Sequence, residues 1–158
     1  MMAKPTIRPL VLDLGEVDAL ADLAVSINSR ELERTGGVQA RGQSDYGRIA
    51  SIMSTVYATY FGVIPAERYS DFTVQVVTMM DMMVSGHPFV DGNKRTALIM
   101  TNTIIRVIGF DVDADDSPEA DNNVLYQLVT GLASSRIDRA QAAGMMSNII
   151  VRKNGVQS

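Results

Sequence analysis

The chain has 158 residues, 46% of them hydrophobic, a formal net charge of -4 and no cysteine. This length and composition fit one domain with a continuous core, exclude disulfides and thiolate metal sites, and argue against broad electrostatic binding of nucleic acid. The apolar run near the N-terminus is too short for a signal peptide, and no stretch of about 18 uncharged apolar residues is present. We therefore expect no membrane span and a cytoplasmic protein.

Two helices are predicted in the first part of the chain. The first covers about residues 15–34 and carries apolar residues at helical spacing, followed by glycines that suit a C-cap: Leu20, Leu23, Ala24, Ile27, Gly36 and Gly37. The second covers 44–61, with Ser44 or Asp45 as N-cap and an apolar face of Ile49, Ile52, Met53, Val56, Tyr57 and Tyr60. We predict that residues 62–69, which include Pro65, form an exposed loop or a small hairpin rather than a helix.

Two later segments, 70–85 and 94–108, are apolar around most of a helical surface, which is typical of helices in the middle of a domain. Ser70 is the predicted N-cap of the first. We interpret the methionines from Met79 to Met83 as adaptable core filling rather than a binding groove. Asp81, which lies among them, is either a partly buried anchor or the exposed edge of the helix.

The C-terminal part begins with an extended, acidic stretch at 110–113. Ser117-Pro118 opens a further helix that reaches about residue 134, because proline suits the first helical position. Asp138 caps a last helix that continues through Ile149, Ile150 and Val151. We expect the tail 152–158 to be frayed.

The most informative stretch joins the two apolar helices and reads His87-Pro88-Phe89-Val90-Asp91-Gly92-Asn93-Lys94-Arg95-Thr96. Asn93 is a favoured N-cap, so the amides after it point out of the helix start and can bind an anion. Gly92 leaves room for a phosphate to approach the backbone. Lys94 and Arg95 add positive charge where the helix dipole is already positive, which suggests an anionic ligand.

Two further side chains complete this chemistry. Asp91 can hold Mg²⁺, which usually takes one or two carboxylates together with phosphate oxygens. His87 is the only histidine of the chain and can accept a proton from an attacking hydroxyl. Taken singly, each residue also has a structural explanation as a loop histidine, a turn, a cap or a solvated surface charge. Their occurrence within ten residues favours a site for a nucleotide phosphate.

A P-loop is excluded. Five residues instead of four separate Gly86 from Gly92, Asn93 stands before Lys94, and a helix instead of a strand leads into the stretch.

The stretch resembles the signature of the Fic family, His-x-Phe-x-(Asp/Glu)-Gly-Asn-x-Arg, and Lys94-Arg95-Thr96-Ala97 is similar to its death-on-curing branch, the Doc toxins. Further similarity is carried by Gly36-Gly37, by Ser44-Asp45-x-Gly47-Arg48 with Ile52, and by Gly131-x-Ala133 followed by Ile137. It extends over most of the chain from about Glu31 onward. The first thirty residues match only as a helix with an added N-terminal strand.

The resemblance implies an all-α fold, a compact bundle of about six helices with a small β-hairpin flap. It would form a single Fic/Doc-type domain over residues 1–158, with 1–14 as an N-terminal extension. The flap would lie at 62–69, and a segment of the target protein would lie alongside it.

The resemblance also implies an activity. Most Fic enzymes transfer AMP to a hydroxyl of a protein, and their motif has glycine at the position of Lys94 and arginine at that of Leu98. The Doc branch resembles protein kinases that bind the nucleotide reversed and transfer its terminal phosphate. A lysine crowds the room that glycine leaves for a diphosphate, and its ammonium suits a terminal phosphoryl group. This implies a Doc-like toxin that transfers the γ-phosphate of ATP to a Ser or Thr of a translation factor such as elongation factor Tu.

Roles carry over from the family signature residue by residue. His87 would be the base, Asp91 would hold Mg²⁺, and Gly92, Asn93, Lys94 and Arg95 would bind the ATP phosphates. Lys94 and Arg95 would also stabilise charge during transfer, and Phe89 would pack inward. ATP and Mg²⁺ are thus the expected co-substrate and cofactor.

The resemblance further implies an antitoxin partner whose disordered tail folds into a groove of the toxin. No inhibitory Ser/Thr-x-x-x-Glu-Gly/Asn segment is present, so inhibition should come from that second chain. Two alternatives stay open. One is a Fic-type AMP transferase. The other is a catalytically weak nucleotide- or protein-binding module, to which two departures would point: Ser85, where the Doc sequence has arginine, and Leu98.

Overall fold

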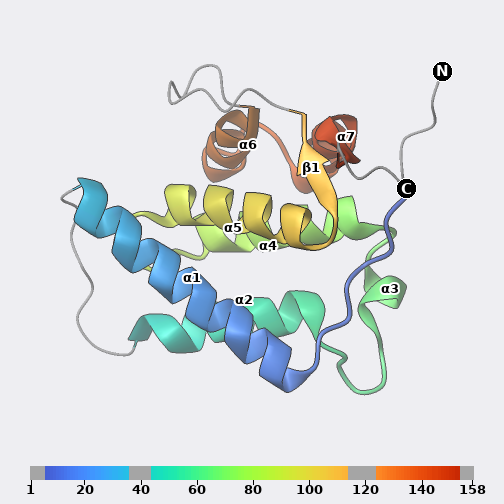
Figure 1. Ribbon diagram of the computed structural model, residues 1–158, viewed down its shortest axis with the longest axis horizontal. Helices are drawn as coiled ribbons and strands as arrows, with labels where there is room; N and C mark the ends of the chain where they lie inside the picture. Colours follow the sequence, from blue (N-terminus) through green and yellow to red (C-terminus); the bar gives the residue numbers. More distant parts are fainter. Residues whose placement is uncertain (1–5, 36–43, 114–123, 154–158) are drawn as a thin grey trace.

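The computed structural model describes residues 6–35, 44–113 and 124–153, and in these ranges the chain is mostly helical (Figure 1). The elements are α1 (Leu14–Thr35), α2 (Ser44–Tyr57), α3 (Pro65–Arg68), α4 (Phe72–Ser85), α5 (Asn93–Val107), β1 (Phe110–Val112), α6 (Val124–Ala133), α7 (Arg139–Ile149) and β2 (Ile150–Arg152). The prediction of an all-α fold is confirmed. The described residues contain seven helical segments instead of about six, and the short one, α3, spans a single turn.

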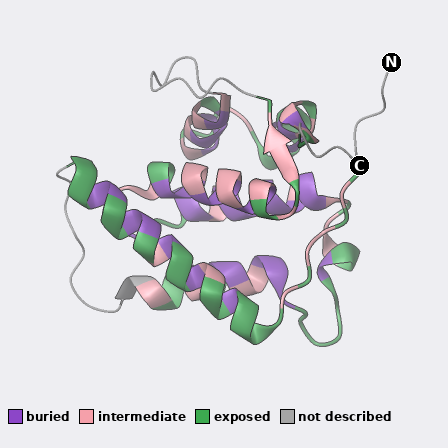
Figure 2. Cartoon of the chain, in the orientation of Figure 1, coloured by how far each residue is buried: buried purple, intermediate pink, exposed green. Residues whose placement is uncertain are grey.

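The helices form three layers, with α4 and α5 in the middle, α1 and α2 on one side, and α6 and α7 on the other (Figure 1). Buried residues follow the inward faces of all these helices (Figure 2). Met79, Met80 and Met83 of α4 are fully buried, so their interpretation as core filling is confirmed. The central position predicted for the two most apolar segments is confirmed as well.

Helices α1 and α2 occupy the predicted segments, with two differences. Leu23 was expected on the inner face of α1 but is exposed, and that face instead includes the polar Asn28 and Glu31. Helix α2 ends at Tyr57 and does not reach residue 61. The side chains of the expected caps Ser44 and Asp45, and the glycines at 36 and 37, lie outside the described residues.

We predicted an exposed loop or small hairpin at 62–69, and the structure has one antiparallel bridge between Tyr60 and Val63, which begins two residues earlier; the segment 60–69 is called the flap below. The expectation that no helix forms here is wrong, because Pro65–Arg68 is the single turn α3. Proline presets the backbone angle of the first helical residue, and the Tyr69 amide closes the turn on the Pro65 carbonyl at 2.8 Å. The two-stranded sheet lies elsewhere, between β1 and β2.

Capping residues fix the ends of α4 and α7. The N-cap of α4 is Asp71 and not Ser70, since the Asp71 carboxylate accepts from the Val74 amide. Asp138 caps α7 as predicted, in a reciprocal capping box with Gln141. Asp81 proves to be a partly buried anchor, because Arg139 Nε of α7 donates to it at 2.6 Å.

The C-terminal prediction needs one correction. Residues 110–112 are extended as expected, but their antiparallel partner is Ile150–Arg152, so Ile150 and Val151 form a strand and do not continue α7. Arg152, which we placed in the tail, therefore lies in β2. The predicted helix start at residues 117 and 118 lies outside the described residues.

Residues 6–13 run extended along α2 and α4, without forming the added strand that we expected among them. The buried Gln75 side chain exchanges two hydrogen bonds with the Leu10 backbone, and the Leu12 amide donates to the Tyr57 carbonyl. Among the described residues, no helix combines the length and apolarity needed to cross a bilayer.

Candidate active site

The predicted site residues lie on the loop between α4 and α5 and on the first turn of α5. Gly86 ends α4, and a Cβ there would lie 2.6 Å from the Met82 carbonyl oxygen, so the helix end requires glycine. The loop is anchored from within by Phe89, which is buried as predicted. His87 has a φ of 47°, in the left-handed region that side chains usually avoid. Its exposed imidazole is thus presented by a constrained backbone.

Arg48 of α2 secures the beginning of the loop. Its Nη1 donates to the carbonyls of Gly86 at 3.2 Å and His87 at 3.3 Å. The guanidinium therefore links the backbone of the histidine to a helix that is distant in sequence.

Asn93 closes the loop. Its Oδ1 accepts from the Phe89 amide at 3.0 Å and its Nδ2 donates to the Phe89 carbonyl at 2.9 Å. Our expectation that Asn93 is the N-cap is wrong: Gly92, with a φ of 79°, is the N-cap and Asn93 is the first helical residue. The side-chain amide thus closes a turn, while glycine provides the left-handed conformation.

Helix α1 supports the same region through two polar side chains. Asn28 Nδ2 donates to the Asp91 carbonyl at 2.8 Å and to Thr96 Oγ1 at 3.1 Å. Glu31 accepts from Arg95 Nε at 3.2 Å. The hydrogen bond from Arg34 and, more weakly, the Arg95 contact lower the pKa of the Glu31 carboxyl against the opposing effect of burial.

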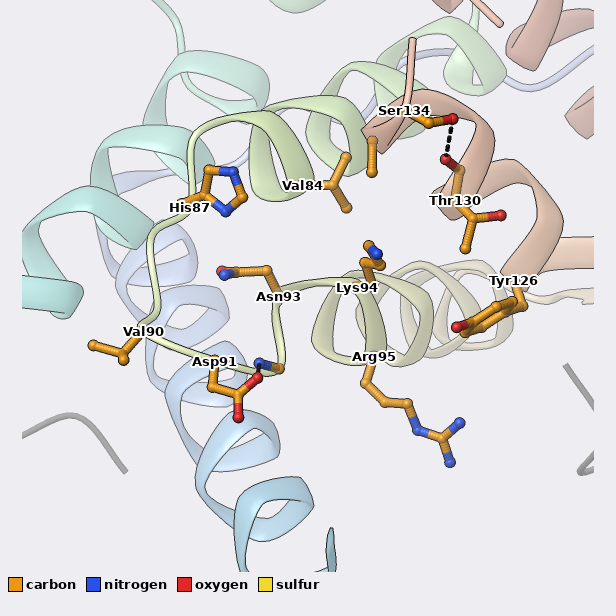
Figure 3. A pocket seen from close by; sticks show the side chains of 12 residues that line it. Val84, His87, Val90, Asp91, Asn93, Lys94, Arg95, Tyr126, Thr130 and Ser134 are labelled. Atoms are coloured by element: carbon orange, nitrogen blue, oxygen red, sulfur yellow. Dashed lines mark hydrogen bonds between the residues drawn. The ribbon is translucent and has the colours of Figure 1, made fainter. Parts of the chain in front are cut away.

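A pocket of about 550 Å³ brings together all six residues that we predicted for the site: His87, Asp91, Gly92, Asn93, Lys94 and Arg95 (Figure 3). Its opposite wall is formed by Tyr126 and Thr130 of α6 and by Ser134, the residue that follows the helix. His87 and Lys94 point into the space between the loop and α6 (Figure 3). Arg95 points to the other side, where it is paired with Glu31 (Figure 3).

The start of α5 has the properties of an anion site. Intrahelical hydrogen bonding begins with the Thr96 amide, which donates to the Gly92 carbonyl at 2.9 Å. The amides of Asn93, Lys94 and Arg95 therefore precede the first bond of the helix. Together with the helix dipole and the Lys94 ammonium, they give this end of the pocket a positive potential.

Asp91 lies at the rim of the pocket, and its Oδ1 accepts from the Gly92 amide at 2.8 Å (Figure 3). The described residues include no group of three or more His, Cys, Asp or Glu side chains that would hold a metal ion by themselves. This donor set suits Mg²⁺ held by one carboxylate with phosphate oxygens and water, and it does not suit a metal bound by protein ligands alone.

The motif did not reveal Asn28, Arg48, Glu31 or the α6 wall as parts of the site. A signal was available for two of them, because Asn28 and Glu31 occupy positions of the buried face of α1, where a polar residue needs a partner. Tyr126, Thr130 and Ser134 recur every four residues, but only the packing of α6 shows which face they line.

A family model described as "Fic/DOC family" matches residues 17–105, more than half of the chain. The chain belongs to this family. The match contains most of α1, the flap, the loop and most of α5, and thus every residue of the loop that lines the pocket. A curated relative, "Protein kinase doc" of Escherichia phage P1, is 30% identical over 125 residues, which cover 79% of this chain and 89% of the relative.

Lys94 is among the residues that the Fic/DOC family model matches. It lies on the first turn of α5 and shares the pocket with His87 and Asp91. Leu98, at the position where the Fic signature has its later arginine, is half-buried beside the core, so the site has no second arginine there.

Proposed function

We propose that this chain is a Doc-like toxin, a protein kinase that transfers the γ-phosphate of ATP to a Ser or Thr hydroxyl of a cytosolic protein. The observation that carries this proposal is the position of Lys94, which points into the pocket that holds His87, Asp91 and the start of α5. The name of the phage P1 relative, a protein kinase, supports the same assignment.

In the proposed reaction the acceptor oxygen attacks the γ-phosphorus, the bond from that phosphorus to the β,γ-bridging oxygen breaks, and ADP leaves. The proton of the acceptor hydroxyl goes to the imidazole of His87. The amides at the start of α5 and the Lys94 ammonium bind the phosphoryl oxygens, on which charge is concentrated during transfer. Mg²⁺, when bound with Asp91 as its protein ligand, would neutralise phosphate charge.

Arg95 takes a different part in this proposal from the one that the motif alone suggests. Its guanidinium is held by Glu31 on α1, so it contributes to the positive potential of the pocket from the side rather than from its centre. Because Lys94 points into the pocket, it would be the cation that faces the transferred group in this proposal.

The proposed target is a translation factor such as elongation factor Tu, which would dock along the flap. Exposed apolar side chains on the flap, among them Phe61, Val63 and Ile64, support a protein acceptor rather than a small molecule. The proposed regulator is an antitoxin protein, and the proposed location of all three proteins is the cytoplasm.

The test uses ATP labelled separately at the α- and γ-phosphates, incubated with the purified protein, magnesium and either a cell extract or purified elongation factor Tu. A kinase gives protein-bound label from the γ position alone. Label from the α position would instead assign AMP transfer, and the absence of both from a folded protein would assign a binding module. Unlabelled elongation factor Tu beside a labelled protein in the extract would reject the target and retain the reaction.

A further inference from the structure

Asn28, like Arg48, contacts the loop from outside it. It lies on the buried face of α1 and is 5% exposed. Its Nδ2 carries two hydrogens, and two hydrogen bonds use both: one to the Asp91 carbonyl and one to the Thr96 hydroxyl. A single side chain thus joins the end of the loop to the first turn of α5.

The contact to Asp91 determines the direction of a whole peptide group. In a trans peptide the carbonyl of one residue and the N–H of the next point in opposite directions. Because α1 binds the Asp91 carbonyl, the Gly92 N–H points away from α1. There it donates to the Asp91 carboxylate, so the position of that carboxylate follows from the position of the carbonyl.

The close approach of α1 leaves this peptide little freedom. A Cβ at position 92 would lie 3.0 Å from Asn28 Nδ2 and 3.4 Å from Leu32 Cδ2. Glycine is therefore favoured at 92 by its φ of 79°, and the side chains of α1 would have to shift slightly to admit a Cβ.

We propose that Asn28 is a positioning residue that sets the Asp91–Gly92 peptide and, through the Gly92 amide, aims the Asp91 carboxylate at the rim of the pocket. This inference rests on the proposed function, in which Asp91 is the protein ligand of Mg²⁺. It assigns to α1 a part in phosphoryl transfer without contact to the nucleotide.

The test compares Asn28→Leu, which keeps a similar volume but has no donor, with the exposed neighbour variant Ser29→Ala. In Asn28→Leu we expect the half-saturating magnesium concentration for γ-phosphate transfer to rise by about 10- to 100-fold, the usual effect of losing a group that orients a metal ligand. Thr96→Val removes the other acceptor and leaves the Asp91 contact, so its effect should be several-fold smaller. Ser29→Ala should behave as wild type.

A second readout requires no ligand. NMR of the glycine amides should show that Gly92 N–H exchanges with solvent faster in Asn28→Leu, by about tenfold or more, the size of a lost 1.4 kcal/mol hydrogen bond. Amides in the centre of α4 should exchange as in wild type, which separates a local loss of position from general destabilisation. If Asn28→Leu does not fold, Asn28→Ser replaces it, because the shorter hydroxyl cannot reach both partners.

Wild-type magnesium dependence and wild-type Gly92 exchange in a folded Asn28→Leu protein would overturn the proposal. Absence of any label transfer by the wild-type protein would instead reject the proposed function. The exchange of the Gly92 amide would still decide whether Asn28 positions this peptide.

Discussion

The α4–α5 loop and the flap differ in the number of side chains that hold their backbones in place. Side chains from α1, α2 and α5 hold the loop, through Asn28, Arg48 and Asn93, and two of its residues, Pro88 and Phe89, are buried. The flap is held mainly by Arg68, and its tip carries Phe61, which is fully exposed and has a φ of 48°. Rigid support suits a group that must transfer a proton or a phosphate, whereas an exposed apolar tip suits contact with another protein.

The largest expected effect concerns His87. We predict that His87→Ala lowers γ-phosphate transfer by about 10²- to 10⁴-fold, the usual contribution of a general base, and leaves the thermal unfolding midpoint close to that of wild type. The imidazole is exposed and the loop is held by other side chains, so stability should be retained. Transfer rates and circular dichroism melting curves check both parts. Undiminished transfer would remove His87 from the mechanism.

The second prediction concerns Asp91. Asp91→Ala should lose activity together with its dependence on magnesium, because Asp91 carries the only carboxylate among the described residues that line the pocket. Loss of the acceptor for the Gly92 amide should cost about 1 kcal/mol of stability at most, since this hydrogen bond is exposed. Magnesium titrations of the transfer rate provide the measurement. A variant that keeps both its activity and its magnesium response would place the metal elsewhere.

The third prediction breaks the flap and leaves the loop intact. Arg68 donates to the carbonyls of Thr55, Ala58 and Val63, and its guanidinium lies 5.4 Å from the centre of the Tyr60 ring. We expect Arg68→Ala to lower the free energy of unfolding by about 2 kcal/mol and to make the flap more susceptible to proteolysis. The KM for the protein acceptor should rise several-fold, while kcat changes little because the loop is unaffected.

The control for this prediction is Arg68→Lys. A single ammonium lacks the planar fork that reaches carbonyls on two segments, so this variant should recover less than half of the lost stability. A large fall in kcat with unchanged KM would contradict the separation between flap and loop.

Local pattern predicted much of this molecule. Apolar spacing located α1, α2, α4 and α5, and the linear motif placed six pocket residues within ten positions, since they all belong to one loop and one helical turn. Where two capping residues stand side by side, as at Ser70 and Asp71, the sequence does not decide between them; the choice depends on which side chain reaches the Val74 amide.

What the pattern did not predict depends on contacts between distant segments. Ile150 and Val151 continue the apolar run of α7 in the sequence, but both are β-branched, and pairing with β1 makes them a strand. Arg48 and Asn28 bind the loop from distant helices. Arg48 is 38 positions before its partner Gly86, and Asn28 is 63 positions before its partner Asp91. The sequence indicated only that the polar residues Asn28 and Glu31 on the apolar face of α1 need hydrogen-bond partners.

The smallest expected effect tests that buried face through pH. The pKa of the Glu31 carboxyl is lowered in the folded protein. Its charged form therefore stabilises the fold fully at pH values above the ordinary pKa of glutamate, near 4.3. This stability is lost as the pH falls through the lower pKa of the folded protein. Wild type should therefore exceed Glu31→Gln in unfolding midpoint at neutral pH, and the difference should shrink on acidification to about pH 3. Glu33→Gln, on the exposed side of α1, keeps both arginine contacts and should follow wild type. A difference in unfolding midpoint between wild type and Glu31→Gln that stays constant across this range would mean that Glu31 supports the start of α5 by packing alone. Charge pairing with Arg34 and Arg95 would then add nothing to the rigidity that distinguishes the loop from the flap.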